Sequence, residues 1–175
     1  MAQTLIEDRY SRVARALHWS MGLLIVANLA GGLLHDVNAE LIMPLHKATG
    51  IVLLGLALLR IVWRMMHPAP ALPADMATWE RATASFTHAI LYALMVLIPL
   101  SGWVMASASR WPISFYGLFD VPKFNVIKDS PLAEAAHEGH EIMGYLMIAL
   151  LVLHILAALR HHFMLKDGML ARMWR

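Results

Sequence analysis

Residues 140–154 read HEIMGYLMIALLVLH, an almost wholly apolar stretch with a histidine at each end. In an α-helix, the 14 steps of about 100° bring the two imidazoles to within ~40° of each other around the axis. The helical rise separates the two rings by ~21 Å along that axis. We therefore expect a long apolar helix that presents two ionisable rings on one face, at two different depths.

The composition of the 175-residue chain is that of a membrane protein, with 59% hydrophobic and 15% charged residues. Four stretches have the ~20 mostly apolar residues needed to cross a hydrocarbon core of ~30 Å. They lie at about 16–35, 45–63, 86–107 and 141–160. The sequence predicts one all-α domain over residues 1–175, a transmembrane four-helix bundle. Lys47 and Arg60, near the ends of the second stretch, are expected to snorkel toward the membrane surface.

Several classes of site are excluded by what the chain lacks. It has no cysteine, which excludes disulfides, iron–sulfur clusters and the covalent attachment of c-type haem. We find no glycine loop for phosphate and no nucleic-acid pattern, so membrane lipid and not nucleic acid is the expected partner. The first apolar stretch is too long for a signal-peptide core and lacks a plain cleavage site, so we expect it to be retained.

Lysine and arginine are divided unevenly between the two sides of the predicted bundle. Ten belong to one side: Arg9, Arg12, Arg15, Arg60, Arg64, Arg81, Arg160, Lys166, Arg172 and Arg175. Four belong to the other: Lys47, Arg110, Lys123 and Lys128. The positive-inside rule then predicts a multi-pass protein of a bacterial inner (cytoplasmic) membrane, with both termini in the cytoplasm.

The outer, periplasmic side is predicted to be negative overall, because seven acidic residues accompany its four basic ones. The acidic residues are Asp36, Glu40, Asp120, Asp129, Glu134, Glu138 and Glu141. This side also carries the longest connection, residues 108–139, which is rich in aromatic residues and proline. We expect that connection to form an ordered cap or a short interfacial helix.

Three of the ten histidines share the pattern H-x-x-x-G, with a glycine one turn further along the same helix face. The pairs are His18 with Gly22, His46 with Gly50 and His140 with Gly144. A small residue beside an axial histidine leaves room for a flat macrocycle to lie against the backbone. Small residues also mark contacts between membrane helices, so packing alone is the alternative interpretation.

The alternating directions of the helices pair four histidines by depth. His46 and His140 fall near the outer surface, whereas His18 and His154 fall near the inner surface. Each pair could supply two axial imidazoles to one iron, which predicts two b haems per chain. A zinc site would gather its ligands in one place. A di-iron bundle needs inward-facing carboxylates, which the predicted spans essentially lack.

Other histidines have less specific interpretations. His137 lies ~100° away from the face of His154, so we expect a loop or helix-cap residue. His35 and His67 are expected at the membrane interface. His88 is expected to pack or to hydrogen-bond.

Charged and polar residues near the inner end have more than one interpretation. His161 lies near the face of His154 and about 10 Å further inward. There it could hydrogen-bond a quinone carbonyl and relay a proton, or it could be a snorkelled helix-end histidine. Arg12 and Arg15 precede His18 by one to two turns and could contact haem propionates or lipid phosphates.

The chain resembles the prokaryotic cytochrome b561 family over nearly its whole length. The resemblance rests on RALHW (15–19), LHKATG (45–50), HAILYALMVLIPLSGWVM (88–105), HE (140–141), LH (153–154) and ALRHHFMLKDGMLARM (158–173). It implies four helices, two b haems and electron exchange with membrane quinone. It also implies haem ligands at His18, His46, His140 and His154, and a ubiquinone contact at His161.

Within that family the chain is similar to the superoxide oxidases in size and plan. That resemblance predicts an oxidoreductase that passes electrons from periplasmic superoxide through both haems to ubiquinone. The negative outer surface raises an alternative, a quinol-linked carrier that serves a separate periplasmic redox protein. A third possibility is a non-enzymatic, haem-bearing membrane anchor of a larger complex.

Overall fold

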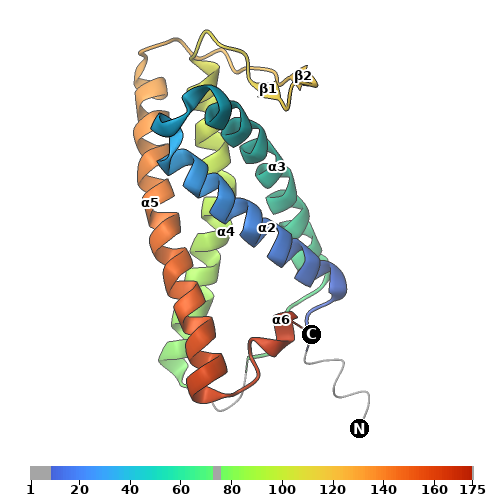
Figure 1. The fold of residues 1–175 in the computed structure, drawn as a ribbon. Coiled ribbons are helices and arrows are strands. Elements are labelled where there is room, and N and C mark those ends of the chain that lie inside the picture. The colour runs from blue at the N-terminus through green and yellow to red at the C-terminus, as the bar shows by residue number, and fades with distance from the viewer. Residues whose placement is uncertain (1–8, 73–75, 175) are drawn as a thin grey trace.

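A computed structural model describes residues 9–72 and 76–174. Its main elements are four long helices: α2 (Arg12–Leu33), α3 (Ala39–Met66), α4 (Thr78–Ser107) and α5 (Pro131–Arg160). Helices that follow one another in the chain pack side by side and run in opposite directions (Figure 1). All four are long and apolar enough to cross a membrane. The predicted all-α transmembrane four-helix bundle is therefore confirmed.

The helices run past most of the predicted spans. In α2, α3 and α5 a polar capping residue, and not the edge of the apolar stretch, defines the first turn. The Ser11 hydroxyl accepts a hydrogen bond from the Ala14 N–H at 3.2 Å. Asn38 does the same for Leu41, and Ser130 for Ala133. Helix α4 has 30 residues and a length of ~45 Å, so its ends project beyond a ~30 Å hydrocarbon core.

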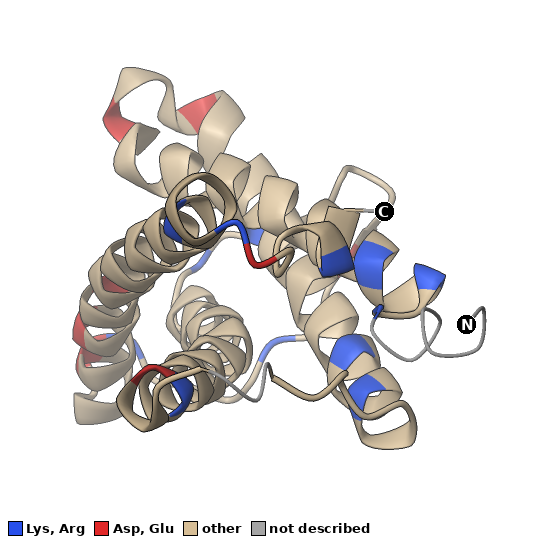
Figure 2. Cartoon of the chain, turned by 90° about the horizontal axis from the view of Figure 1, so that it is seen from below, with Lys and Arg blue, Asp and Glu red and all other residues tan. Residues whose placement is uncertain are grey.

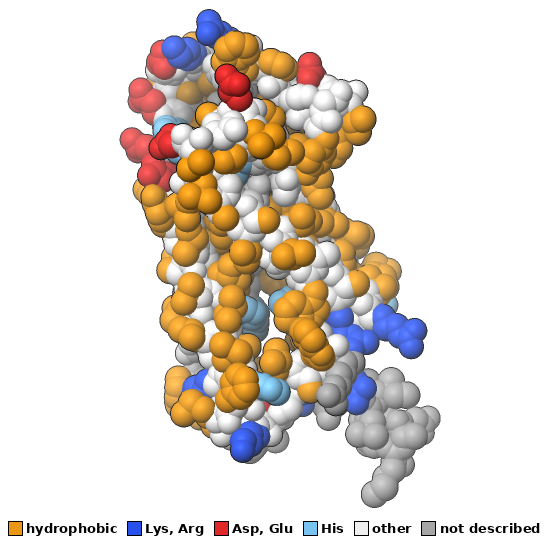
Figure 3. All heavy atoms as spheres, viewed as in Figure 1, with side chains coloured by type: hydrophobic (Ala, Val, Ile, Leu, Met, Phe, Trp, Pro, Cys, Tyr) orange, Lys and Arg blue, Asp and Glu red, His pale blue; other side chains and the backbone are white. Residues whose placement is uncertain are grey.

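The surface of the bundle is apolar around its middle. Figure 3 shows hydrophobic side chains covering this band, with most of the visible acidic side chains at the end near the hairpin. Large side chains such as Leu23 and Met65 are 73% and 77% exposed. Lipid tails are as apolar as these side chains, so nothing drives them into a core. The buried residues on the helices are accordingly few: Leu17, Met21, Ala48, Leu53, Leu54, Ala57, Leu94, Ala106, Ser107, Ala133 and Met147.

The connection after α4 forms an ordered cap that includes a small hairpin. Strands β1 (Ser114–Phe115) and β2 (Phe119–Asp120) pair antiparallel around Tyr116 and Gly117, which both have positive φ. The buried side chains of Ile113 and Val121 pack against Ala106 at the end of α4. The ordered cap was expected. The suggested interfacial helix was not found in residues 108–130, and α5 begins at Pro131.

The first and last described residues lie at the opposite end of the bundle from the hairpin (Figure 1). The Tyr10 N–H donates to the Arg172 carbonyl at 3.3 Å, and the Trp19 indole N–H donates to the Met173 carbonyl. These bonds hold the short helix α6 (Ala171–Trp174) against the start of α2. Lysines and arginines lie near both ends of the described chain, as Figure 2 shows from this side.

Candidate haem-ligand sites

The outer pair consists of His46 on α3 and His140 on α5. Their ring centroids are 6.1 Å apart, and the ring planes are inclined by 82°. A metal held between two imidazoles at a metal–nitrogen distance of about 2 Å separates the ring centres by about 6 Å. The spacing of this pair therefore suits two axial ligands of one iron.

Hydrogen bonds to backbone carbonyls orient both outer rings. The Nδ1 atom of His46 lies 3.0 Å from the Asn28 carbonyl oxygen, and that of His140 lies 2.9 Å from the Ile98 carbonyl oxygen. A carbonyl oxygen only accepts, so Nδ1 must carry the proton in each ring. The lone pair of Nε2 is then free for a metal, which is the usual arrangement around metal-binding histidines.

Glycines on the neighbouring helices make room for these two rings. A Cβ added at Gly102 would lie 2.9 Å from Cε1 of His140, and one at Gly32 would lie 3.2 Å from Cε1 of His46. Each glycine follows the accepting residue by four positions, Gly32 after Asn28 and Gly102 after Ile98. We call each combination a carbonyl–glycine pair, and both outer histidines lie against one.

The glycines singled out from the sequence lie in more open surroundings. A Cβ at Gly22 or Gly144 would meet nothing within 4 Å, and one at Gly50 would meet only the Asn28 side chain at 4.0 Å. This space is compatible with the predicted macrocycle, and the role of the three glycines stays a prediction. No sequence pattern identifies Gly32 or Gly102, because helical spacing relates residues within one helix and not across two helices.

The inner group contains three histidine rings. His18 on α2 and His154 on α5 have centroids 6.1 Å apart, the same separation as in the outer pair. His88 on α4 lies closer to His154, at 5.4 Å. That separation is shorter than the ~6 Å expected across a bound metal, so we retain His18 and His154 as the candidate ligands.

Arg60 enters this inner group, and the expectation that it snorkels to the surface was wrong. One guanidinium nitrogen, Nη2, lies 3.2 Å from Nδ1 of His18, while Nε donates to the Tyr92 hydroxyl at 3.2 Å. Arg60 follows His46 by 14 residues on α3, which returns it to the same helix face at the depth of the inner rings. The side chain therefore points into the bundle.

The inner residues fit a group that carries carboxylates. Nε of Arg15, one turn before His18, is buried and has no hydrogen-bond partner. A buried donor without an acceptor is costly, and a haem brings two propionate carboxylates that could accept from it. Together with the free Nε2 lone pairs of the outer rings, this donor indicates that the residues present fit haem.

Bare metal ions have less support in the described chain. Within residues 9–72 and 76–174, no group of three or more His, Cys, Asp and Glu side chains is arranged to hold one. Each histidine pair instead offers two ligands. This number suits a macrocycle that already supplies four nitrogen ligands to its metal.

His161 forms a hydrogen-bonded pair with Asp167. Its Nδ1 atom lies 2.5 Å from Oδ2 of Asp167, and the two side chains are 15% and 24% exposed. The chain continues from α5 as the π-helical turn η2 (His161–Leu165) and then reverses at Lys166, whose φ is 53°. This reversal brings the carboxylate back to the imidazole, so the other ring nitrogen remains available to a ligand.

The pair keeps the carboxylate ionised. Burial alone would raise the pKa of Asp167, but hydrogen bonds from His161 and from the Met169 N–H hold that pKa below its ordinary value of 3.8. Because the pKa of Asp167 is lowered, the pair stabilises the fold fully at a pH above the ordinary value of 3.8. The stabilisation is lost only as the pH falls below that value, through the lowered pKa.

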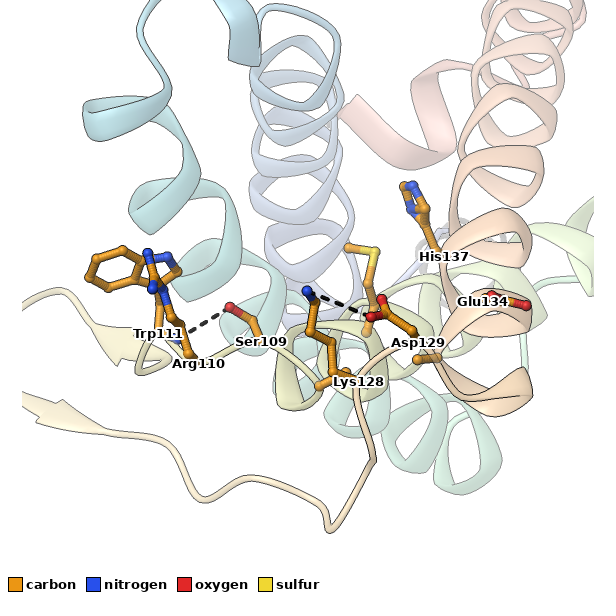
Figure 4. A pocket seen from close by; sticks show the side chains of 10 residues that line it. Ser109, Arg110, Trp111, Lys128, Asp129, Glu134 and His137 are labelled. Carbon is orange, nitrogen blue, oxygen red and sulfur yellow. Dashed lines mark hydrogen bonds and ion pairs between the residues drawn. The ribbon is translucent and has the colours of Figure 1, made fainter.

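A pocket of about 630 Å³ opens at the outer end between α4, the cap and α5. Lys128 and Asp129 approach each other on one side of it, and His137 of α5 lies on another (Figure 4). The prediction that His137 is a loop or cap residue was wrong, since it lies in the second turn of α5. Ser130 caps that helix well before the predicted span begins at residue 141.

Two further histidines, His35 and His67, lie at helix ends. His35 contacts Asp36 at 3.1 Å, and the His67 ring stacks on Trp63 with centroids 4.0 Å apart. Both positions agree with the interfacial placement expected from the sequence.

Comparison with known families assigns the chain. A family model described as prokaryotic cytochrome b561 matches residues 9–175. The chain belongs to the prokaryotic cytochrome b561 family. It is therefore a multi-pass membrane electron-transfer protein, and its family implies b-type haem.

Curated relatives agree with this assignment. "Cytochrome b561 homolog 2" of Escherichia coli (strain K12) is 31% identical over 99% of this chain and 95% of the relative. "Cytochrome b561 homolog 1" of the same organism is also 31% identical, over 95% and 97%. "Probable superoxide oxidase CybB" of Yersinia pestis is 28% identical over 96% and 97%.

The outer ligand can be tested by counting haems. With one haem predicted at each histidine pair, His140→Ala should halve the haem content, because it removes one of the two candidate ligands of the outer site. His137→Ala is the matched control and should retain both haems. The pyridine haemochrome method on purified protein measures the content. Equal loss in the two variants would show that His140 was the wrong choice.

The carbonyl–glycine pairs make a second prediction. Gly102→Ala is expected to displace the His140 ring and weaken haem binding at the outer site by about 10–100-fold, as loss of a ligand's supporting contacts does. Gly55→Ala is the control, because its Cβ would meet nothing within 4 Å. Haem titration of protein expressed without haem measures both affinities. Unchanged affinity in Gly102→Ala would contradict the role of this pair.

Proposed function

We propose that this cytochrome b561 family member binds two b haems and carries electrons between the periplasmic side and the quinone pool. The outer haem takes His46 and His140 as ligands, and the inner haem takes His18 and His154. The observation that carries the proposal is the common 6.1 Å separation of both ring pairs. Haem bound at each pair supplies a one-electron redox change, and one helix, α5, holds a ligand for each.

We propose the bacterial inner membrane as the location, with both termini in the cytoplasm. The uneven division of basic residues supports this orientation. The two described chain ends lie at the same end of the bundle (Figure 1), and lysines and arginines lie near them (Figure 2). Arg175, one of the ten basic residues counted for this side, lies outside the described residues.

The proposed activity is that of a superoxide:ubiquinone oxidoreductase. Two superoxide anions, one quinone and two protons give two O₂ and one quinol. Each superoxide loses one electron at the outer side, and the quinone gains two electrons and two protons at the inner side. The relative named "Probable superoxide oxidase CybB" supports this choice, although its identity to this chain is 28%.

Local charge on the outer side supports attraction of an anion. The ammonium groups of Lys47 and Lys123 are close enough to interact. Lys123 also donates to the Ser109 carbonyl at 2.5 Å, and Ser109 lines the outer pocket together with Arg110 and Lys128. Lys47 and Lys123 thus form one basic group beside the cap. Arg110 and Lys128 line the outer pocket, where Asp129 and Glu134 also lie.

The quinone site is proposed at His161. Ionised Asp167 accepts from Nδ1 of His161, which fixes the ring and leaves Nε2 to hydrogen-bond a quinone carbonyl. The position at the inner end of α5, seven residues after His154, supports this placement.

Quinol formation by the purified protein tests the activity. Superoxide added to protein in detergent with a soluble ubiquinone analogue should produce quinol and O₂, and superoxide dismutase should abolish that production. The His18→Ala variant, which should lack the inner haem, should be inactive. Haem reduction by quinol without any reaction with superoxide would favour the quinol-linked carrier. Absence of both reactions would favour the membrane anchor.

The outer basic residues make a third prediction. Lys123→Gln is expected to slow the reaction with superoxide severalfold at low salt and to flatten its dependence on ionic strength. Lys166→Gln, which removes a lysine at the opposite end, is the matched control. Stopped-flow haem reduction by superoxide measures both rates. An equal effect of the two substitutions would argue against steering at the cap.

The His161–Asp167 pair makes a fourth prediction. His161→Ala should lower quinone reduction by about 10²-fold, the low end for a positioned acid–base group. Asp167→Asn should lower it less and raise the KM for quinone. Asp36→Asn is the control, because it breaks an exposed His–Asp contact at the other end. Steady-state assays with varied quinone separate KM from kcat. Identical kinetics for Asp167→Asn and the wild type would refute the role of Asp167.

A further inference from the structure

Arg60 is a charged residue within a membrane-spanning helix. It lies six residues before the end of α3, and its side chain is half-buried between α2 and α4. An ionised side chain inside a span is costly to place there, so its presence usually serves binding or transport. The question is which group the guanidinium serves.

The contacts of Arg60 in the described chain are all with uncharged groups. Its guanidinium nitrogens reach Nδ1 of His18, the Tyr92 hydroxyl and, at 3.4 Å, the Ala14 carbonyl. The guanidinium carbon also lies 5.7 Å from the centroid of the Tyr92 ring. The ion pairs found among residues 9–72 and 76–174 do not include Arg60. The positive charge therefore has no counter-anion in this part of the protein.

The contact with His18 is incompatible with ligation through Nε2. Arginine only donates hydrogen bonds, so Nδ1 of His18 must accept and the ring proton must lie on Nε2. When a metal takes the Nε2 lone pair, the proton lies on Nδ1, and two donors then face each other. The outer rings show no such conflict, because carbonyl oxygens face their Nδ1 atoms.

We propose that Arg60 is the anion-binding residue of the inner site: it leaves His18 when haem binds and pairs with a haem carboxylate. Arg15 supplies a second donor, because its buried Nε lacks a partner beside the same turn of α2. The Ala14 carbonyl contact places Arg60 next to this turn. The inference rests on the proposed inner haem site. It adds that the charge of Arg60 influences the properties of that haem.

The charge of Arg60 has a consequence for electron flow. A cation in a low-dielectric environment favours the reduced state of a nearby iron, since that state carries one positive charge fewer. The guanidinium already lies close enough to the His88 and His154 rings to interact with them electrostatically. Arg60 therefore raises the reduction potential of the inner haem relative to the outer one and favours electron transfer toward the quinone side.

Redox titration of the two haems tests this inference. The full chain, purified in detergent, is titrated while the absorbance of each haem is followed, and the component lost in His18→Ala identifies the inner haem. Arg60→Gln should lower the midpoint of that component and leave the other unchanged. Arg60→Lys keeps the charge and should retain most of the wild-type value. Lys166→Gln removes an exposed charge at the same end of the bundle, so it is the control and should leave that midpoint nearly unchanged.

Each result has a definite meaning. Wild-type midpoints in Arg60→Gln would overturn the inference. If Arg60→Gln loses the inner haem, retention of that haem in Arg60→Lys would support anion binding, whereas equal loss in both would overturn it. Fewer than two haem components in the wild type would instead defeat the two-haem proposal on which the inference rests.

Discussion

An imidazole buried among membrane helices must give one nitrogen to the protein before it can offer the other to a metal. At the outer site this requirement is met by the backbone. Nδ1 of His46 and of His140 each donate to a carbonyl of the adjacent helix, and a glycine four residues later lets the ring approach. Because carbonyls are neutral acceptors, they fix the ring orientation without placing a charge in the span.

At His18 the inner site does not meet this requirement, because a charged donor and not a carbonyl faces Nδ1. This difference separates the two ends of the molecule. His18 faces the guanidinium of Arg60, and Arg15 adds a buried donor nearby. Two similar ring pairs can thus sit in unlike electrostatic surroundings within one apolar bundle. Such a difference gives a one-electron carrier a preferred direction without any change in ligand type.

The sequence predicted the four helices well, because twenty apolar residues in a row have few other uses in a protein. It also predicted which histidines share a depth, since rise and rotation per residue are fixed, and the structure brings His46 to His140 and His18 to His154. It could not predict Gly32 or Gly102, whose importance depends on how two helices face each other. Arg60 was misplaced because hydropathy treats a charge near a helix end as exposed and ignores the face on which it lies.

The helix starts and the cap were predicted less well for a related reason. Capping serines and an asparagine extend α2, α3 and α5 into polar sequence, where hydropathy gives no signal. The hairpin depends on positive φ at Tyr116 and Gly117, and the first of these residues carries no strong turn preference.

Helix α5 carries one histidine of each pair on a single uninterrupted segment, so the distance between the two sites behaves as a fixed length. Substitutions along the helix can change potentials, packing or solvent access, but they leave the ~21 Å between the two backbone positions unchanged. Insertion of a single residue between His140 and His154 would turn one ring by about 100° relative to the other. Substitutions along α5 can therefore change the energies of the two sites, while the distance between the two histidine positions stays constant.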